Sequence, residues 1–393
     1  MILQDKNFQR QATRIIAVLL FIYAAVMLYR IVAEQKQWDF KTYYYATVTY
    51  FSGQSPYEIE SLSKAAGEEV LHPFVYLPPS FYFFKIFTLF PYQASFYLFL
   101  ILKLALLTGL IIIWLKYFID DKSQMIIFLL LCFFGYRETI LRDLYTGNVS
   151  IIEQILIWSA AVFYLRSKYW VYCALIALSA LFKGSSLLLL LIPLIDRNRH
   201  AVAAVIAGIG TFFLINYFAF IGRPGLFEGF IAVALSLDER GSHTPASLTI
   251  ARDIGDFLRG PLGFDISFWL YGLFVAGIII ATALVLRKYD FRKNKVNYLM
   301  LCFLVYALIS PRFKDYSYIL LIVPAYYVLT KATQSNWVRL AVILTACLTF
   351  LDYQPYAVAL ILYILLLKYI WRNRADIDKK AADSGLAASP FGK

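Results

Sequence analysis

The sequence has few charged residues for its length. They make up only 16% of the 393 residues, whereas hydrophobic residues account for 61% and aromatic residues for 18%. This composition excludes a soluble domain of ordinary make-up and indicates a polytopic membrane protein. Carboxylates are the scarcer charge, which leaves a net charge of +12. The Lys and Arg residues stand in short clusters between apolar runs, as is typical of cytoplasmic loops beside anionic lipids. Membrane lipids are therefore expected partners, and nucleic acid is not.

Cysteine and histidine are also scarce. The four cysteines all lie inside apolar runs without CxxC spacing: Cys132, Cys173, Cys302 and Cys347. The three histidines do not cluster with them, so neither a disulfide framework nor a thiolate metal site is indicated. The adjacent Asp120 and Asp121 could suggest a metal motif. They stand beside Lys116 and Lys122 in an expected cytoplasmic loop, where solvated charge is the favoured interpretation, so no metal and no cofactor are predicted.

Long apolar runs are what the sequence has in abundance. Twelve of them predict membrane spans or halves of broken spans: 15–33, 94–115, 124–136, 148–165, 170–183, 185–195, 200–221, 266–286, 296–309, 317–330, 338–350 and 355–371. The first follows Lys6, Arg10 and Arg14 and is long for a signal peptide, so it is expected to be an uncleaved span. The predicted fold is all-α, with about 12 transmembrane helices in a single domain over residues 1–371.

The run from Phe74 to Phe90 is ambiguous because Pro78, Pro79 and Lys85 interrupt it. If it is a half-buried or interfacial helix, both termini are cytoplasmic and the basic loops obey the positive-inside rule. Residues 34–93 and 222–265 then form extracytoplasmic loops. The small, polar segment 372–393 is predicted to be a disordered cytoplasmic tail.

The first outer loop begins with one carboxylate ahead of an aromatic run. Phe40, Tyr44, Val48 and Phe51 recur at helical spacing and predict an interfacial helix lying flat on the membrane. Asp39 has two compatible interpretations. It could be the N-cap of this helix, or a general base that accepts a proton from a hydroxyl group at the membrane surface.

Cations stand where the outer ends of spans are expected. Arg142, in the segment RETILRDLYTGNVS (137–150), could belong to a salt-bridged loop or bind a phosphate. Lys183 interrupts the apolar stretch LSALFKGSSLLLLL, where function is the default expectation and snorkelling to the surface is the alternative. Arg312, Lys314 and Asp315 stand together in SPRFKDYSY, after a proline that separates two spans.

These features occur in an order that resembles a known family. They are an aspartate, an aromatic helix and a G-x-S-P-Y turn (39–57), Y-x-P-P (76–79), Gly-Asn-Val (147–149), Lys183 at a span break, Ser-Leu (247–248), and SP followed by polar residues (310–315). Together they resemble glycosyltransferase family 87. The chain departs from the pattern in having Asn148 in place of Gln, Pro245-Ala246 in place of Asn-Gln, and Asp315-Tyr316 in place of a histidine.

The resemblance implies an integral membrane GT-C enzyme of the cell (inner) membrane with an extracytoplasmic active site. It implies a polyprenyl-phosphate sugar donor, with mannose expected, a lipid-linked or glycan acceptor, and Asp39 as the catalytic base of an inverting, metal-independent transfer. The expected substrate contacts are Tyr43, Tyr57, Tyr76, Arg142, Asn148, Lys183, Ser247, Arg312, Lys314 and Asp315. Of these, Arg142, Lys183, Arg312 and Lys314 are candidates for the donor phosphate.

A membrane transporter or a flippase for lipids or lipid-linked sugars is the alternative function. That class predicts ionisable residues near the bilayer midplane and internal repeats. The sequence has no convincing repeat, and its polar segments gather on one expected side of the membrane.

Overall fold

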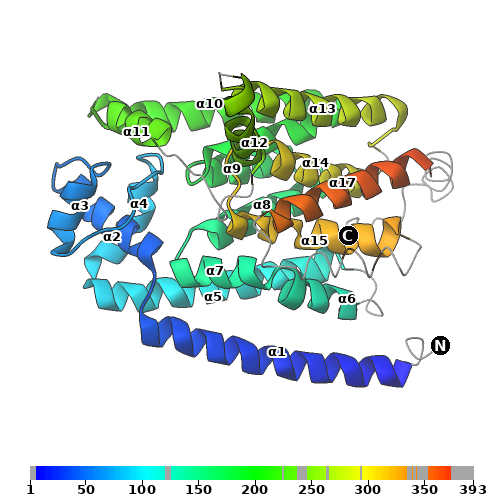
Figure 1. Cartoon of the computed structure of the whole chain (residues 1–393), viewed down its shortest axis with the longest axis horizontal. Helices are drawn as coiled ribbons and strands as arrows, with labels where there is room; N and C mark the ends of the chain where they lie inside the picture. Colours follow the sequence, from blue (N-terminus) through cyan, green and yellow to red (C-terminus); the bar gives the residue numbers. More distant parts are fainter. Residues whose placement is uncertain are drawn as a thin grey trace.

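The computed structural model describes residues 6–119, 125–223, 225–236, 246–262, 265–292, 294–333, 339, 342 and 353–372. Every regular element within these ranges is a helix (Figure 1). Helices suit a chain this apolar, because a helix satisfies its own backbone hydrogen bonds where no water is present to do so.

The helices are as follows. The N-terminal part contains α1 (Lys6–Glu34), α2 (Trp38–Phe51), α3 (Ile59–Ala66), α4 (Ser80–Phe84), the 3₁₀ turn η2 (Phe87–Leu89) and α5 (Tyr92–Tyr117). The middle contains α6 (Met125–Leu130), the π-helical η4 (Leu131–Gly135), α7 (Arg137–Thr146), α8 (Ser150–Leu165), α9 (Tyr169–Ala180), the 3₁₀ helix η5 (Gly184–Asp196), α10 (Arg199–Ile221) and α11 (Gly225–Ser236). The C-terminal part contains α12 (Ser247–Leu262), α13 (Ser267–Lys288), α14 (Lys295–Ile309), the 3₁₀ helix η6 (Asp315–Leu321), α15 (Ile322–Tyr327), the π-helical η7 (Val328–Ala332) and α17 (Gln354–Arg372).

Within the part of the chain that the structure describes, five helices are long and apolar enough to cross a membrane. They are Ala17–Glu34, Tyr92–Tyr117, Arg199–Ile221, Ser267–Arg287 and Gln354–Arg372. Other apolar helices have 10–17 residues, and at about 1.5 Å per residue they are shorter than a hydrocarbon core of roughly 30 Å. The chain is a multi-pass membrane protein, and the count of about twelve spans remains a prediction. The run 338–350 lies almost entirely outside the described residues, as do residues 373–393 and the Asp120-Asp121 pair.

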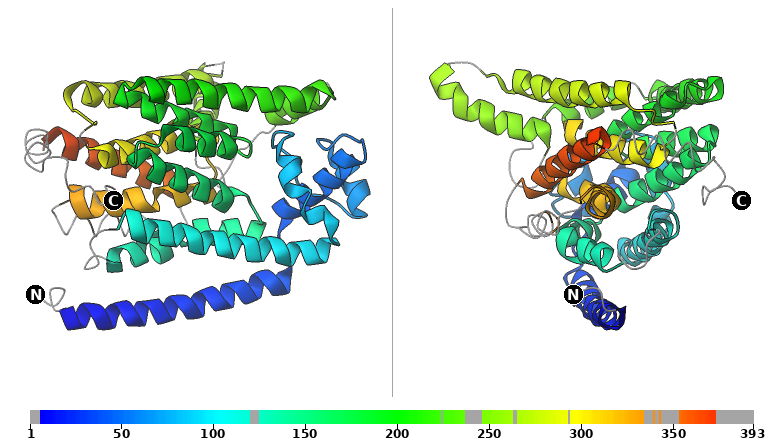
Figure 2. Two further views of the ribbon diagram at one scale, coloured as in Figure 1. Left: turned by 180° about the vertical axis from the view of Figure 1, so that it is seen from behind. Right: turned by 90° about the vertical axis from the view of Figure 1, so that its right-hand side faces the viewer.

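The long helices run roughly parallel, and α2, α3 and α4 gather at one end of the molecule (Figure 1). The first residues of α1 and the last residues of α17 lie at the opposite end (Figures 1 and 2). The helix α1 runs along one edge of the bundle, and only 6% of Ala17–Glu34 is buried (Figure 2). Most of α1 is therefore available to lipid.

The α2–α4 region has an aromatic core of its own. Phe40 and Phe99 stack with their ring centroids 4.2 Å apart, and Tyr50 stacks on Phe81 at 4.5 Å. The run from Phe74 to Phe90 joins this core as a loop followed by α4 and η2, the longer of which has five residues. No element within that run is long enough to cross a membrane.

The expectation that the apolar stripe of α2 faces the membrane interface is wrong. Phe40 is fully buried, Tyr44 is 8% exposed, and Phe51 is the member of the predicted stripe that is exposed. Thr42 and Tyr43, on another side of the helix, are buried as well. The pattern of apolar spacing was correct, but the covering surface is protein, supplied by α4, η2 and α5, and not lipid.

Two helices lie where only loops were expected. The helix α7 occupies the segment that precedes the Gly-Asn-Val motif, and α11 lies within the outer loop 222–265. Phe230 of α11 packs edge-on against Tyr57, with ring centroids 5.9 Å apart. The long loop is thus partly folded onto the aromatic core.

Candidate active site

A cavity of about 1000 Å³ lies where α1, α2, α7 and the start of η5 meet the segment 311–317. Nine of the eleven residues that the sequence assigned to the site line it: Asp39, Tyr43, Tyr76, Arg142, Asn148, Lys183, Arg312, Lys314 and Asp315. The first and the last of them, Asp39 and Asp315, are 276 residues apart in the sequence, and the fold brings all nine to one place.

Asp39 is the second residue of α2, and the N-cap of that helix is Gln37. The interpretation of Asp39 as an N-cap is therefore wrong. Its Oδ2 instead accepts a hydrogen bond of 2.7 Å from Nδ2 of Asn148, which follows α7. Among the described residues no hydrogen bond to Oδ1 is formed, so this oxygen can accept a proton from a ligand in the cavity.

Asn148 and two tyrosines complete the surroundings of Asp39. The Asn148 Nδ2 also lies 3.1 Å from the Tyr43 hydroxyl and 3.3 Å from the Tyr76 hydroxyl. The two hydroxyls are 2.8 Å apart and hydrogen-bonded to each other. One carboxylate, one amide and two phenols thus form a compact polar group at the cavity wall.

The tyrosines cannot replace Asp39 as a base at neutral pH. Burial raises the pKa of Tyr43 well above its usual value, and the neighbouring Tyr76 and Asp39 raise it further. Burial, followed by the charge of Asp39, also raises the pKa of Tyr76. Both phenols therefore stay protonated and act as hydrogen-bond donors or acceptors.

Gly147 explains how Asn148 comes so close to α2. Its φ is +72°, and a Cβ atom at this position would lie 2.8 Å from Cβ of Phe40 and 2.9 Å from Cβ of Gln37. Any other residue would meet both a strained backbone and a steric clash. The glycine ends α7 in the left-handed conformation typical of helix C-termini and lets the next residue reach Asp39.

A fully buried ion pair supports the same turn. The Lys103 ammonium of α5 lies 2.6 Å from Oδ1 of Asp143 in α7, and both side chains are 0% exposed. Lys103 also donates to the Asp143 backbone carbonyl, which accepts a second hydrogen bond from the backbone N–H of Asn148. Oδ2 of Asp143 accepts from the backbone of Ile151 in the first turn of α8 at 3.3 Å. The pair fixes the end of α7 relative to the start of α8.

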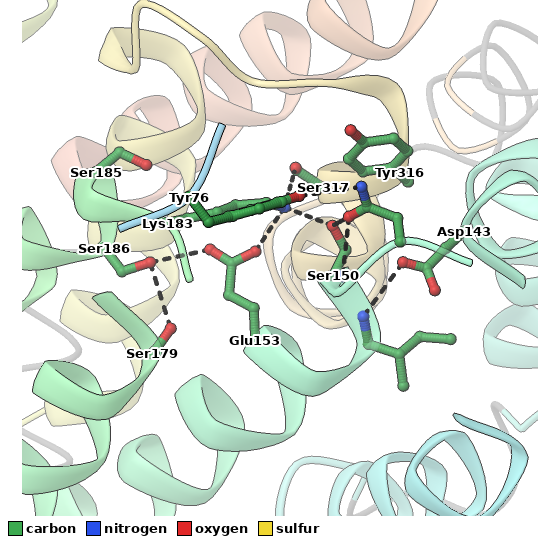
Figure 3. A network of polar contacts seen from close by, with 12 residues as sticks. Tyr76, Asp143, Ser150, Glu153, Ser179, Lys183, Ser185, Ser186, Tyr316 and Ser317 are labelled. Atoms are coloured by element: carbon green, nitrogen blue, oxygen red, sulfur yellow. Dashed lines mark hydrogen bonds and ion pairs between the residues drawn. The ribbon is translucent and has the colours of Figure 1, made fainter. Parts of the chain in front are cut away.

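Lys183 is held in a second buried network (Figure 3). Its ammonium lies 2.8 Å from Oε2 of Glu153, 2.5 Å from Oγ of Ser150 and 2.9 Å from Oγ of Ser317. Oε1 of Glu153 accepts from the Ser186 hydroxyl at 2.9 Å. The Lys183 charge is thus paired inside the protein.

Lys103, Asp143 and Glu153 were missed by the sequence analysis. Each is an ionisable residue in or beside an apolar helix, which by default suggests a functional site. The segments LILKLALL and SIIEQILI carry the same signal as the apolar stretch around Lys183.

A second group of charged residues, which we call the cationic rim, lines the rest of the cavity. Its members are Arg30, Arg137, Arg142, Arg312 and Lys314. Arg142 pairs with Asp315, and Arg137 pairs with Glu138 at 2.6 Å. The side chains of Arg30, Arg137 and Arg142 are 57%, 38% and 37% exposed, so the rim remains open to a ligand.

Two predicted contacts lie outside the cavity lining. Tyr57 is buried, and its hydroxyl donates to the Tyr76 carbonyl at 3.0 Å. Ser247, at the start of α12, donates to the Ser310 carbonyl at 3.3 Å. Both hydroxyls hold segments that line the cavity without reaching it themselves.

The model of glycosyltransferase family 87 matches residues 74–311, more than half of the chain. The chain belongs to glycosyltransferase family 87. Neither the search of curated proteins nor the search of solved structures gave a match. The family 87 assignment confirms the resemblance drawn from the motifs and identifies the chain as a membrane glycosyltransferase. Asp39 precedes the matched region, so its role depends on the geometry of the cavity.

Proposed function

We propose that this family 87 protein is a GT-C enzyme that transfers a sugar, with mannose expected, from a polyprenyl-phosphate donor to a lipid-linked or glycan acceptor. Transfer takes place on the extracytoplasmic face of the cell membrane and inverts the anomeric centre. The observation that carries the proposal is one cavity that joins a carboxylate with an available oxygen to a group of cations.

The charge of the cavity suits a lipid phosphate. Six cations line it, namely the five of the cationic rim and Lys183, against three carboxylates, Asp39, Glu138 and Asp315. A phosphate monoanion or dianion is stabilised by cations that form charge-assisted hydrogen bonds. Among the cations, the sequence predicted Arg142, Lys183, Arg312 and Lys314 for this role.

The position of the cavity also suits a donor that resides in the membrane. Tyr23, Met27 and Ile31 of α1 line one side of it, and α1 is otherwise mostly exposed. A prenyl chain could reach the site along this helix while its sugar phosphate lies at the polar end. The positive-inside rule supports an extracytoplasmic location for this end of the bundle, because the opposite end carries the start of α1 and the end of α17, which the basic loops predict to be cytoplasmic.

The reaction is a single displacement. The acceptor hydroxyl gives its proton to Oδ1 of Asp39 while its oxygen forms a bond to the anomeric carbon, on the face opposite the phosphate. The bond between the anomeric carbon and the phosphate oxygen breaks, and its electron pair leaves with the polyprenyl phosphate. Because the leaving group is already a stable anion, the scheme calls for no metal. The protein has to orient the groups, remove one proton and bind the phosphate.

The test is sugar transfer by the purified full chain in lipid nanodiscs. Radiolabelled polyprenyl-phosphate mannose is the probe, a membrane lipid extract is the acceptor, and wild type is compared with Asp39→Asn. Loss of a general base lowers the rate by about 10²–10⁴-fold, and Asn keeps the shape of Asp. Label transfer by the wild type with at least a hundredfold loss in Asp39→Asn is expected. Equal transfer by both proteins would rule out Asp39 as the base.

A further inference from the structure

We propose that Lys183 does not bind the donor phosphate but orients the base, through a hydrogen-bond chain formed by Lys183, Ser150, Asn148 and Asp39, which we call the polar chain. This inference rests on the proposed role of Asp39 as the base. It gives Lys183 a role other than phosphate binding and makes Ser150 and Asn148 positioning residues.

The first step concerns the donors of Lys183. An ammonium has three N–H groups and no acceptor. Three acceptors surround it, Oε2 of Glu153 at 2.8 Å, Oγ of Ser150 at 2.5 Å and Oγ of Ser317 at 2.9 Å. A fourth side is covered by the Tyr316 ring, whose centroid lies 5.1 Å away. The ammonium is thus already surrounded by protein groups, since it donates hydrogen bonds to Ser150 and Ser317 and forms an ion pair with Glu153.

The second step is the direction of the chain. Because Lys183 can only donate, the Ser150 oxygen must accept from it, and the Ser150 hydroxyl proton points to Oδ1 of Asn148 at 3.0 Å. The Ser150 backbone N–H donates to the same oxygen at 3.1 Å. Two donors on one atom identify it as the amide oxygen. The other side of the amide is therefore the donor side, and it faces Asp39 at 2.7 Å.

The third step is the consequence for the base. The amide of Asn148 is fixed at its oxygen by α8 and can present only N–H groups to Asp39, Tyr43 and Tyr76. This holds Oδ2 of Asp39, a residue of the cavity lining, in place and leaves Oδ1 without a hydrogen bond from the described residues. Asn148 is 1% exposed, so its amide is largely shielded from bulk water. The cationic rim is then the part of the cavity that binds the phosphate.

Two variants break the chain in different ways. Ser150→Ala removes the hydroxyl between Lys183 and Asn148 and leaves the charges intact. The double variant Lys183→Met with Glu153→Gln removes both charges of the ion pair together. A single change would leave one buried charge unpaired, which could prevent the protein from folding. Ser179→Ala is the matched control, because Ser179 is equally buried and its hydroxyl contacts Ser186 and no member of the polar chain.

The measurements are kcat and KM for polyprenyl-phosphate mannose, and the Kd of a polyprenyl monophosphate, on the full chain in nanodiscs. Both chain-breaking variants are expected to lower kcat about tenfold, the effect of losing one hydrogen bond that orients the base. Their KM and Kd are expected to stay within about twofold of wild type. Ser179→Ala should match the wild type in all three values.

A rise of about tenfold or more in Kd for the double variant would assign Lys183 to the phosphate and overturn the inference. Unchanged kcat in Ser150→Ala would overturn it as well. The Asp39→Asn variant in the same assay separates the two proposals. If Asp39→Asn is inactive while the double variant only loses phosphate affinity, Asp39 is still the base, but the proposed role of the polar chain fails. If Asp39→Asn is fully active, both proposals fail.

Discussion

The two walls of the cavity are built in opposite ways. On one wall, Lys183, Asn148 and Asp39 are joined by hydrogen bonds between segments, and the side chain of Lys183 is only 19% exposed. On the other wall, the cations of the rim are more exposed, as Arg30 at 57% shows. A wall whose side chains are held by buried hydrogen bonds has one geometry, which suits the orientation of a base. An exposed cationic wall tolerates several geometries, which suits the binding of a phosphate on a flexible lipid.

The largest effect is expected from replacing the hydrogen-bond donor that faces Asp39 by an acceptor. Asn148→Asp would place a second carboxylate against Asp39 and remove the N–H group that donates to it. Two carboxylates at this distance compete for one proton, so kcat should fall about a hundredfold. Asn148→Gln, which keeps an amide, is the matched control and should retain most of its activity. Equal losses in the two variants would show that only the shape of Asn148 matters.

A smaller loss of activity is expected from adding a side chain at Gly147, in the turn that places Asn148 beside Asp39. Gly147→Ala should displace Asn148 from Asp39 and lower kcat about tenfold or more, because displacements of about 1 Å are costly in catalysis. Gly53→Ala is the matched control. Its φ is also positive, at +87°, but no atom lies within 4 Å of a new Cβ, so it shares the strained backbone without the clash. Transfer assays that found both variants equally active would remove the steric argument.

Changes in the cationic rim should affect binding and not the chemical step. Arg312→Gln and Lys314→Gln are each expected to raise the donor KM about tenfold, the effect of one lost charge-assisted hydrogen bond. Because the rim is exposed, added salt should weaken donor binding in the wild type and do so less in these variants. Arg199→Gln, at the first residue of α10, is the control. A drop in kcat at constant KM would contradict this division of roles.

The smallest effect is expected outside the cavity lining. Ser247→Ala removes a hydroxyl that bonds the Ser310 carbonyl at 3.3 Å, and it should change both kcat and KM by no more than about twofold. The same steady-state assay measures it. A large rise in KM would return Ser247 to the group of direct substrate contacts.

Much of the site could be predicted because its residues carry local signals. Lys183 interrupts an apolar run, Asp39 precedes an aromatic helix, and Arg312 and Lys314 follow a proline that separates helices. Each is conspicuous for its chemical type in its neighbourhood. The helical fold followed from composition alone, since 61% hydrophobic residues leave few other structures.

The pairings could not be predicted, because they join distant segments. Nothing in the sequence near Asn148 indicates that its amide faces Asp39, which is 109 residues away, or that Glu153 neutralises Lys183. The burial of Phe40 was missed for the same reason, since periodicity gives the apolar face of a helix but not what covers it. The short helices α7 and α11 contain too few residues for their own patterns to separate them from loops.

The most direct test of the two-wall account compares Asp39→Asn and Arg312→Gln in one steady-state transfer assay with polyprenyl-phosphate mannose. The account predicts that Asp39→Asn loses kcat by at least a hundredfold with little change in KM, whereas Arg312→Gln raises KM about tenfold with little change in kcat. If both variants changed the same kinetic constant, the walls would not have separate roles and the account would be contradicted.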